Sequence, residues 1–171
     1  MVRRIFIAIN LPEDVQEELY SVEEQYSHIP ARWTKQENLH LTLVFLGNTS
    51  DTELIDLISL CKEVGERHTT FQLELSDILY GPSDDNPRMI WASLDESEQL
   101  HALQKDLSET LASSEKLSFV RDKKSFISHL TLARLNQMEF RKIEVEERPV
   151  LDTDLALSFP VKSFDIIESE L

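Results

Sequence analysis

The tetrapeptide His40-Leu41-Thr42-Leu43 occurs a second time, unchanged, at residues 129–132. Each copy lies within an apolar run, residues 39–47 and 126–135, of the kind that forms a β-strand. The chain contains only five histidines, so chance is a poor explanation for two copies of this motif. The repeat therefore predicts two related strands that carry the same polar groups.

Strand geometry predicts what each copy of the motif presents. Successive side chains of a strand point to opposite faces, so His40 and Thr42 share one face while the two leucines share the other. The same holds for His129 and Thr131. If the two halves of the chain pair by approximate two-fold symmetry, two imidazoles and two hydroxyls converge on one cleft.

These groups suit phosphoryl chemistry. A histidine pKa near 6.5 populates both the neutral and the protonated imidazole around neutrality, so one ring can accept a proton while the other donates one. Threonine hydroxyls can donate hydrogen bonds to phosphate oxygens. A single His-x-Thr on a strand is usually an ordinary sheet segment, and the duplication carries the argument. Zinc sites need three or four ligands, usually with Cys or carboxylate, which neither motif supplies, so we expect no metal and no cofactor.

The rest of the chain predicts an α+β fold with largely antiparallel sheets. We expect further strands over residues 4–10, 71–75, 89–94 and 154–168, the last interrupted by Pro160. Helices are expected over residues 12–28, from the Ser50 capping box to a C-cap at Gly65, and over 96–113. Residues 136–148 could form a helix or a loop. No linker rich in Gly, Ser or Pro divides the chain, so we expect one domain over residues 1–171.

Charge and composition limit the partners. The net charge is −15, with 32 acidic against 17 basic residues. Duplex nucleic acid is bound mainly through basic surfaces, so we expect contact with an RNA terminus or a few nucleotides and not with a long duplex. No segment predicts a signal peptide or a membrane span, and the single cysteine, Cys61, fits a reducing compartment, so we expect a cytoplasmic protein.

The chain resembles the 2H phosphoesterases and, within them, the bacterial and archaeal RNA 2',3'-cyclic phosphodiesterases, formerly called 2'-5' RNA ligases. The resemblance rests on the two His-Leu-Thr-Leu motifs and extends over nearly the whole chain. The similar segments are residues 4–12, 32–33, 37–47, 87–92, 126–134 and 164–171. One departure is Ser128, where family members often have Pro before the second histidine.

The resemblance implies a bilobal, duplicated α+β fold with three to four helices and a pseudo-two-fold cleft. It implies that His40 donates a proton to the departing O3' and that His129 accepts a proton from water. Thr42 and Thr131 would hold the phosphate. The implied reaction opens a 2',3'-cyclic phosphate at an RNA 3' end, or on a small cyclic nucleotide, to a 2'-phosphate without a metal. We expect a monomer.

Four residues beside the motifs are weighed separately. Strict alternation places Arg134 on the leucine face, and a bulge or a strand end would be needed for it to bind substrate phosphate. The same count favours a core position for Phe45 over stacking on a base. Trp33 and Arg32 lie in the expected loop before the first motif, where they could meet a base or ribose.

Two other functions use the same groups. One is a 2'-5' RNA ligase or 2'-5' phosphodiesterase, which differs in the linkage it acts on. The other is a nucleotide-binding module without turnover, against which the two intact His and Thr pairs argue.

Overall fold

The computed structural model describes residues 1–121 and 125–169. The strands in these ranges are β1 (Val2–Asn10), β2 (Ala31–Trp33), β3 (His40–Ser50), β4 (Phe71–Gly81), β5 (Met89–Leu94), β6 (His129–Leu135), β7 (Asp154–Val161) and β8 (Asp165–Glu168). The α-helices are α1 (Glu13–Tyr26), α2 (Asp51–Arg67), α3 (Glu98–Ala112) and α4 (Gln137–Phe140), with 3-10 turns η1 (Gln36–Asn38) and η2 (Val145–Glu147). The expected α+β fold is confirmed.

The strands form one eight-stranded sheet in the order β7-β4-β5-β6-β3-β1-β8, with β2 added beside β6. All the recorded strand pairings are antiparallel. The two motif strands, β3 and β6, are neighbours at the middle of this order. Each has a long antiparallel partner on its outer side, β1 for β3 and β5 for β6. The sheet is therefore approximately symmetric about the junction of β3 with β6.

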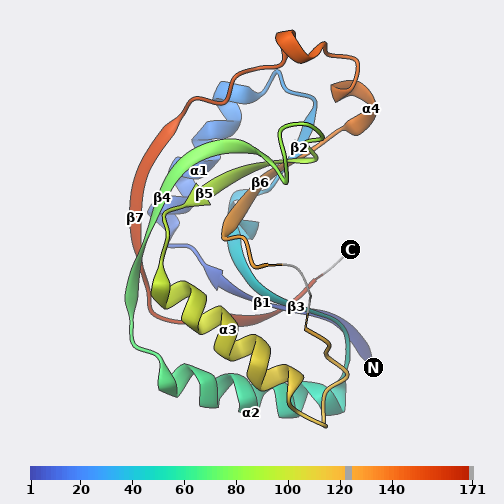
Figure 1. Cartoon of the computed structure of the whole chain (residues 1–171), viewed down its shortest axis with the longest axis vertical. Coiled ribbons are helices and arrows are strands. Elements are labelled where there is room, and N and C mark those ends of the chain that lie inside the picture. The colour runs from blue at the N-terminus through green and yellow to red at the C-terminus, as the bar shows by residue number, and fades with distance from the viewer. Residues whose placement is uncertain (122–124, 170–171) are drawn as a thin grey trace.

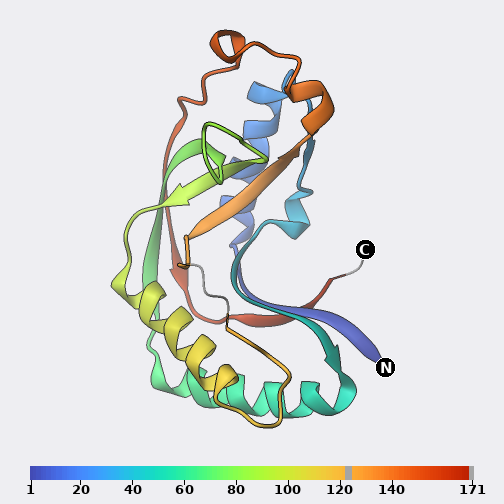
Figure 2. The same cartoon turned by 45° about the vertical axis from the view of Figure 1, so that its right-hand side comes forward.

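The helices divide between the two ends of the sheet (Figures 1 and 2). Helices α2 and α3 pack on each other and contact β3, whereas α1 contacts η1 and β7. In both views α2 and α3 lie at the lower end and α1 at the upper end. The order along the chain does not follow this division. Helix α1 comes directly after β1 and α2 directly after its neighbour β3, yet the two helices lie at opposite ends of the sheet.

The N-terminus of α2 has the expected capping box. Ser50 Oγ accepts from the backbone N–H of Glu53, whose carboxylate in turn accepts from the backbone N–H and the hydroxyl of Ser50. Ser118 N–H donates to the same carboxylate. Hydrogen bonds from Ser50 and then Ser118 lower the pKa of Glu53 to about 2. The cap thus also ties the segment after α3 to α2.

Three expectations about the elements are wrong. Gly65 does not end α2, which continues to Arg67 and is capped at His68. Residues 154–168 form two strands, β7 and β8, but the break falls at residues 162–164 and not at Pro160, which lies inside the edge strand β7, where a residue without N–H is tolerated. Residues 31–33 are not a loop but strand β2, paired with the end of β6.

Residues 136–148, for which the sequence left a helix or a loop open, contain the short helix α4 and the 3-10 turn η2. The last two residues of the 164–171 segment, Glu170 and Leu171, lie outside the described residues. In the described part of the chain, no helix combines the length and the apolar character needed to cross a membrane.

The pairing of β3 with β6 predicts a large effect of truncating its central residue. Leu41 is fully buried and is the β3 residue that pairs with Leu130. Leu41→Ala should lower the free energy of unfolding by about 2–5 kcal/mol, through lost burial and the cavity left behind. Urea unfolding followed by circular dichroism measures this. Ile55→Ala, at a side chain on α2 that is 71% exposed, should change it by less than about 0.5 kcal/mol. Equal effects of the two variants would contradict this account of the core.

Candidate active site

The two motifs lie side by side because Leu41 of β3 pairs antiparallel with Leu130 of β6. Continuing this register by one residue in each direction sets His40 opposite Thr131 and Thr42 opposite His129. Both leucines are fully buried, and the four polar side chains are partly exposed on the other face. The two histidines are then diagonal neighbours, with Cα atoms roughly 7–8 Å apart. We call the face with these four side chains the motif face.

The two imidazoles are held in the same way. His40 Nδ1–H donates to the carbonyl of Asn38 at 2.7 Å, and His129 Nδ1–H donates to the carbonyl of Ile127 at 2.8 Å. A carbonyl only accepts, so Nδ1 carries the proton in both rings and Nε2 is the nitrogen left for chemistry. The acceptor lies two residues before the histidine in each case, which extends the repeat beyond the tetrapeptide.

Each imidazole packs against an aromatic ring from the neighbouring strand. The Trp91 ring of β5 stacks on His129 with centroids 3.8 Å apart, and the Phe6 ring of β1 lies 4.9 Å from His40. Burial lowers the pKa of both histidines from 6.5, and their backbone hydrogen bonds only partly oppose this. Both rings therefore favour the neutral form at neutral pH.

Alternation along both motif strands is broken just after the threonine. The register of β3 against β1 skips Leu43, and the register of β6 against β5 skips Leu132. The last leucine of each motif is thus the extra residue of a β-bulge. A bulge shifts the phase of the strand by one residue, so Phe45 and Arg134 return to the motif face.

This phase shift decides two expectations. Phe45 is 69% exposed, so the core position expected for it is wrong. Arg134 is exposed and lies on the same face as His129 and Thr131, as the alternative with a bulge predicted. The residues on the motif face therefore follow one another along the two strands in a fixed order: Arg134, then His40 beside Thr131, then Thr42 beside His129, then Phe45.

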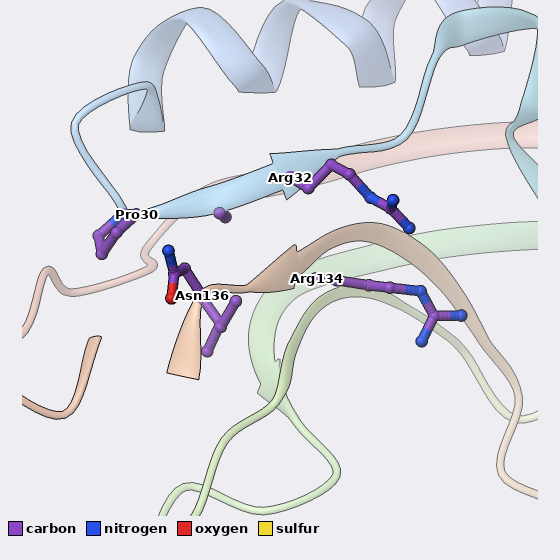
Figure 3. A pocket seen from close by; sticks show the side chains of 6 residues that line it. Pro30, Arg32, Arg134 and Asn136 are labelled. Atoms are coloured by element: carbon purple, nitrogen blue, oxygen red, sulfur yellow. The ribbon is translucent and has the colours of Figure 1, made fainter. Parts of the chain in front are cut away.

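Strand β2 brings Arg32 to this face but not Trp33. Arg32 pairs with Arg134, and both side chains extend in the same direction (Figure 3). They line an open pocket of about 450 Å³ together with Pro30, Ala31, Leu135 and Asn136. Trp33 pairs with the fully buried Ala133 and packs on the core, and its buried indole N–H has no hydrogen-bond partner among the residues that the structure describes. This placement favours packing over the expected contact with a base or ribose.

Trp91 is a residue whose role the sequence did not indicate. It pairs with Thr131, and its ring stacks on that of His129. Gly81 of β4 makes room for it, because a Cβ at that position would overlap the Trp91 ring. The sequence indicates this role only indirectly. Trp91 alternates in β5 with Ile90 and Ala92, which are buried in the core, and this pattern alone does not show what its ring contacts.

Metal-binding clusters of side chains and the single cysteine are alternative kinds of catalytic site. Within residues 1–121 and 125–169, no group of three or more His, Cys, Asp or Glu side chains could hold a metal ion. Cys61 lies buried in α2, and burial raises the pKa of its thiol to about 12, which fits packing and not nucleophilic chemistry.

The family model of LigT-like phosphoesterases matches residues 9–91. A curated relative, an RNA 2',3'-cyclic phosphodiesterase from Thermus thermophilus, is 34% identical; the match covers 98% of this chain and 82% of the relative.

Two solved structures share the fold over nearly the whole chain. The protein TT0787 of Thermus thermophilus has a TM-score of 0.83 and 27% identity, covering 98% of this chain and 89% of the other. Escherichia coli LigT, crystallised with 3'-AMP, has a TM-score of 0.78 and 26% identity, covering 100% and 90%.

The stacking of Trp91 on His129 predicts a shift in the pKa of this histidine. Trp91→Leu should raise the pKa of His129, because it relieves the burial that lowers it. NMR titration of the imidazole signals measures the change. The matched control is Trp33→Leu, which removes the other indole of the chain, a partly buried one, but leaves the motif face intact. An unchanged pKa in Trp91→Leu, or the same shift in both variants, would show that Trp91 does not set this environment.

Proposed function

Because this chain belongs to the LigT-like phosphoesterase family, we propose that its two motif histidines hydrolyse the 2',3'-cyclic phosphate at an RNA 3' end. Its relatives over most of the chain are RNA 2',3'-cyclic phosphodiesterases, and it is a cyclic phosphodiester hydrolase of this type. To this activity we add the roles of the two motif histidines and the two motif threonines. One observation carries the proposal: two identically oriented imidazoles lie diagonally across one strand pair, and neither Nε2 has a hydrogen-bond partner within residues 1–121 and 125–169.

In the proposed reaction, neutral His129 accepts a proton from water at Nε2 as the water oxygen attacks phosphorus. The bond from phosphorus to O3' breaks, and protonated His40 donates its Nε2 proton to O3'. The products are a 3'-hydroxyl and a 2'-phosphate. Proton exchange with solvent returns both rings to their starting forms. The diagonal spacing suits this scheme, because an acid and a base on opposite sides of one phosphorus atom can act on the leaving and attacking oxygens.

The threonines hold the phosphate in this scheme. Thr42 lies opposite His129 and Thr131 opposite His40, so each hydroxyl flanks the phosphate beside a ring. Within the described part of the chain, the Thr131 hydroxyl makes only a long contact with Met89 Sδ, at 4.0 Å, so it is available to a ligand. Two donors on the non-bridging oxygens stabilise the charge that develops in the transition state.

Phe45 gives this face an aromatic surface for a base. Its ring is exposed beyond Thr42 and lies 5.9 Å from the ring of Phe6. Stacking on an aromatic side chain tolerates any base and contributes about 1–3 kcal/mol. Escherichia coli LigT, which shares the fold, was crystallised with 3'-AMP, a ligand of one nucleotide.

We propose that the enzyme is a monomer in the cytoplasm and acts on RNA 3' ends or small cyclic nucleotides. The acidic composition favours a short substrate over a long duplex. A 2'-5' ligase or 2'-5' phosphodiesterase would use the same four groups, and the identity of the products separates these reactions.

His40→Ala and His129→Ala should each lower turnover by about two to four orders of magnitude, the usual contribution of a positioned acid or base. The assay uses an RNA that ends in a 2',3'-cyclic phosphate, in the presence of EDTA, with the 2'-phosphate product identified by mass spectrometry. Thr42→Ala and Thr131→Ala should cost less, because each removes one hydrogen bond.

The matched control is His28→Ala, at an exposed histidine after α1, which should keep wild-type turnover. A folded His40 or His129 variant with wild-type activity would contradict the two-histidine mechanism. Loss of wild-type activity in EDTA, with recovery on adding a divalent ion, would contradict the metal-free scheme.

The lowered histidine pKa values predict an acidic optimum. The productive free enzyme holds one neutral and one protonated ring, and this form is most populated midway between two apparent pKa values that belong to the pair. Because both pKa values are lowered from 6.5, kcat/KM should peak below pH 6.5. Bound anionic phosphate favours protonated imidazole, so the limbs of kcat should lie at higher pH than those of kcat/KM. A kcat/KM maximum above about pH 7.5 would contradict the lowered pKa values.

A further inference from the structure

Strand β6 has two different partners along one of its edges. Strand β5 pairs with residues 129–134 and occupies the other edge. On the shared edge, Leu130 pairs with β3 and residues 133–135 pair with β2, so Thr131 and Leu132 lie between the two pairings. In both views β6 leads to the upper end of the sheet and β3 to the lower end (Figures 1 and 2). The sheet therefore forks at the second motif.

Thr34 fills this fork. It is the first residue after β2, and its side chain is partly buried. Its hydroxyl donates to the carbonyl of Thr131 at 3.0 Å, and its backbone N–H donates to the carbonyl of Leu132 at 2.8 Å. A buried carbonyl without a partner costs free energy, so these bonds replace the ladder bonds that the fork removes. The bond to Thr131 depends on the threonine side chain, whereas the bond to Leu132 needs only a backbone N–H.

The two bonds act on a weakly paired stretch of β6. Leu132 is the extra residue of the bulge against β5, so the ladder is interrupted on both edges of the strand here. The bond to the Thr131 carbonyl fixes the peptide plane that follows this residue, and with it the direction in which the Thr131 side chain leaves the strand. Within the described residues, the Thr131 hydroxyl itself has only its long contact with Met89 Sδ. Its orientation therefore depends on the backbone that carries it.

The segment after Thr34 leads directly to the first motif. The N–H of Asn38 donates to the carbonyl of Lys35 at 2.8 Å, which closes the turn η1. The carbonyl of Asn38 then accepts from Nδ1–H of His40 at 2.7 Å. Because His40 lies opposite Thr131, this short segment is bonded to one member of the pair through Thr34 and to the other through Asn38.

The first motif is held differently. The carbonyl of its bulge residue, Leu43, accepts from Nε2 of Gln104 on α3 at 3.4 Å. Thr42 lies within the pairing of β3 with β1, opposite Ala8. Gln104 thus bonds to a neighbour of the motif threonine, whereas Thr34 bonds to the carbonyl of the motif threonine itself.

We propose that Thr34 is a positioning residue, whose hydroxyl holds the Thr131 backbone so that the Thr131 hydroxyl meets the substrate phosphate. This rests on the proposed function and adds to it a residue outside both motifs. The charge on the non-bridging oxygens grows toward the transition state, so a donor held in place stabilises the transition state more than the ground state. Loss of the Thr34 hydroxyl should therefore lower kcat more than it changes KM.

The kinetic test uses adenosine 2',3'-cyclic phosphate as substrate. Thr34→Val removes the hydroxyl and keeps the shape, so kcat should fall about three- to tenfold, the effect of one hydrogen bond, and KM should change by less than about twofold. Thr34→Ser, which keeps a hydroxyl, should restore most of the lost rate. In the Thr131→Ala background, Thr34→Val should have almost no further effect, because the hydroxyl that it positions is already absent.

Thr49→Val is the matched control. The Thr49 hydroxyl also donates to a backbone carbonyl, that of Gly47 at 3.3 Å, but near the end of β3 far from the motif. Its loss should leave kcat unchanged. A wild-type kcat in Thr34→Val would overturn the proposal. An equal fall in Thr49→Val, or the same Thr34→Val effect with and without the Thr131 hydroxyl, would overturn it as well.

An NMR measurement tests the positioning without turnover. Relaxation of the Thr131 methyl group reports the mobility of this side chain on the picosecond to nanosecond timescale. Its order parameter should fall in Thr34→Val and keep the wild-type value in Thr34→Ser and Thr49→Val. An unchanged order parameter in Thr34→Val would overturn the positioning role. A wild-type protein that does not hydrolyse the cyclic phosphate would instead refute the proposed function, and the NMR result would still decide the role of Thr34.

Discussion

The pairing of Leu41 with Leu130 is the contact on which the proposed site depends. It joins the two halves of the sheet at their centre, and both side chains are completely buried. Because they point into the core, the residues on either side of each leucine must point the other way. One apolar pair thus places two histidines and two threonines on the same face in a diagonal arrangement. No long-range hydrogen bond between the four polar residues is needed to bring them together.

The repeat allowed much of this to be predicted from the sequence. Two identical tetrapeptides in apolar runs predicted the paired strands, and the period of two assigned the polar and the buried faces of each motif. The same period failed immediately after the motifs, at Phe45 and Arg134. A bulge depends on the register between strands, which a single strand's sequence does not contain. The bulges fall at Leu43 and Leu132, whereas Leu41 and Leu130 keep the alternation. Because all four are leucines, the residue type does not distinguish the two kinds of position.

Other misses have the same origin in contacts between distant segments. Trp91 alternates with core residues in its own strand, and only its position beside β6 reveals that it stacks on His129. Pro160 suggests a break until the sheet order shows that β7 is an edge strand, where a residue without N–H is tolerated. Residues 31–33 are too few to show a strand pattern, and β2 exists because the end of β6 offers it a partner.

A nearly symmetric pair of histidines raises the question of which oxygen leaves. Both rings have the same tautomer, a backbone acceptor two residues earlier and a lowered pKa, so neither is marked as the acid by its own surroundings. The difference lies at the ends of the face. Arg134 lies beyond Thr131 and His40 at one end of the motif face, and Phe45 lies beyond Thr42 and His129 at the other. The flanking residues that follow the two bulges, and not the histidines themselves, would direct the proton to O3'.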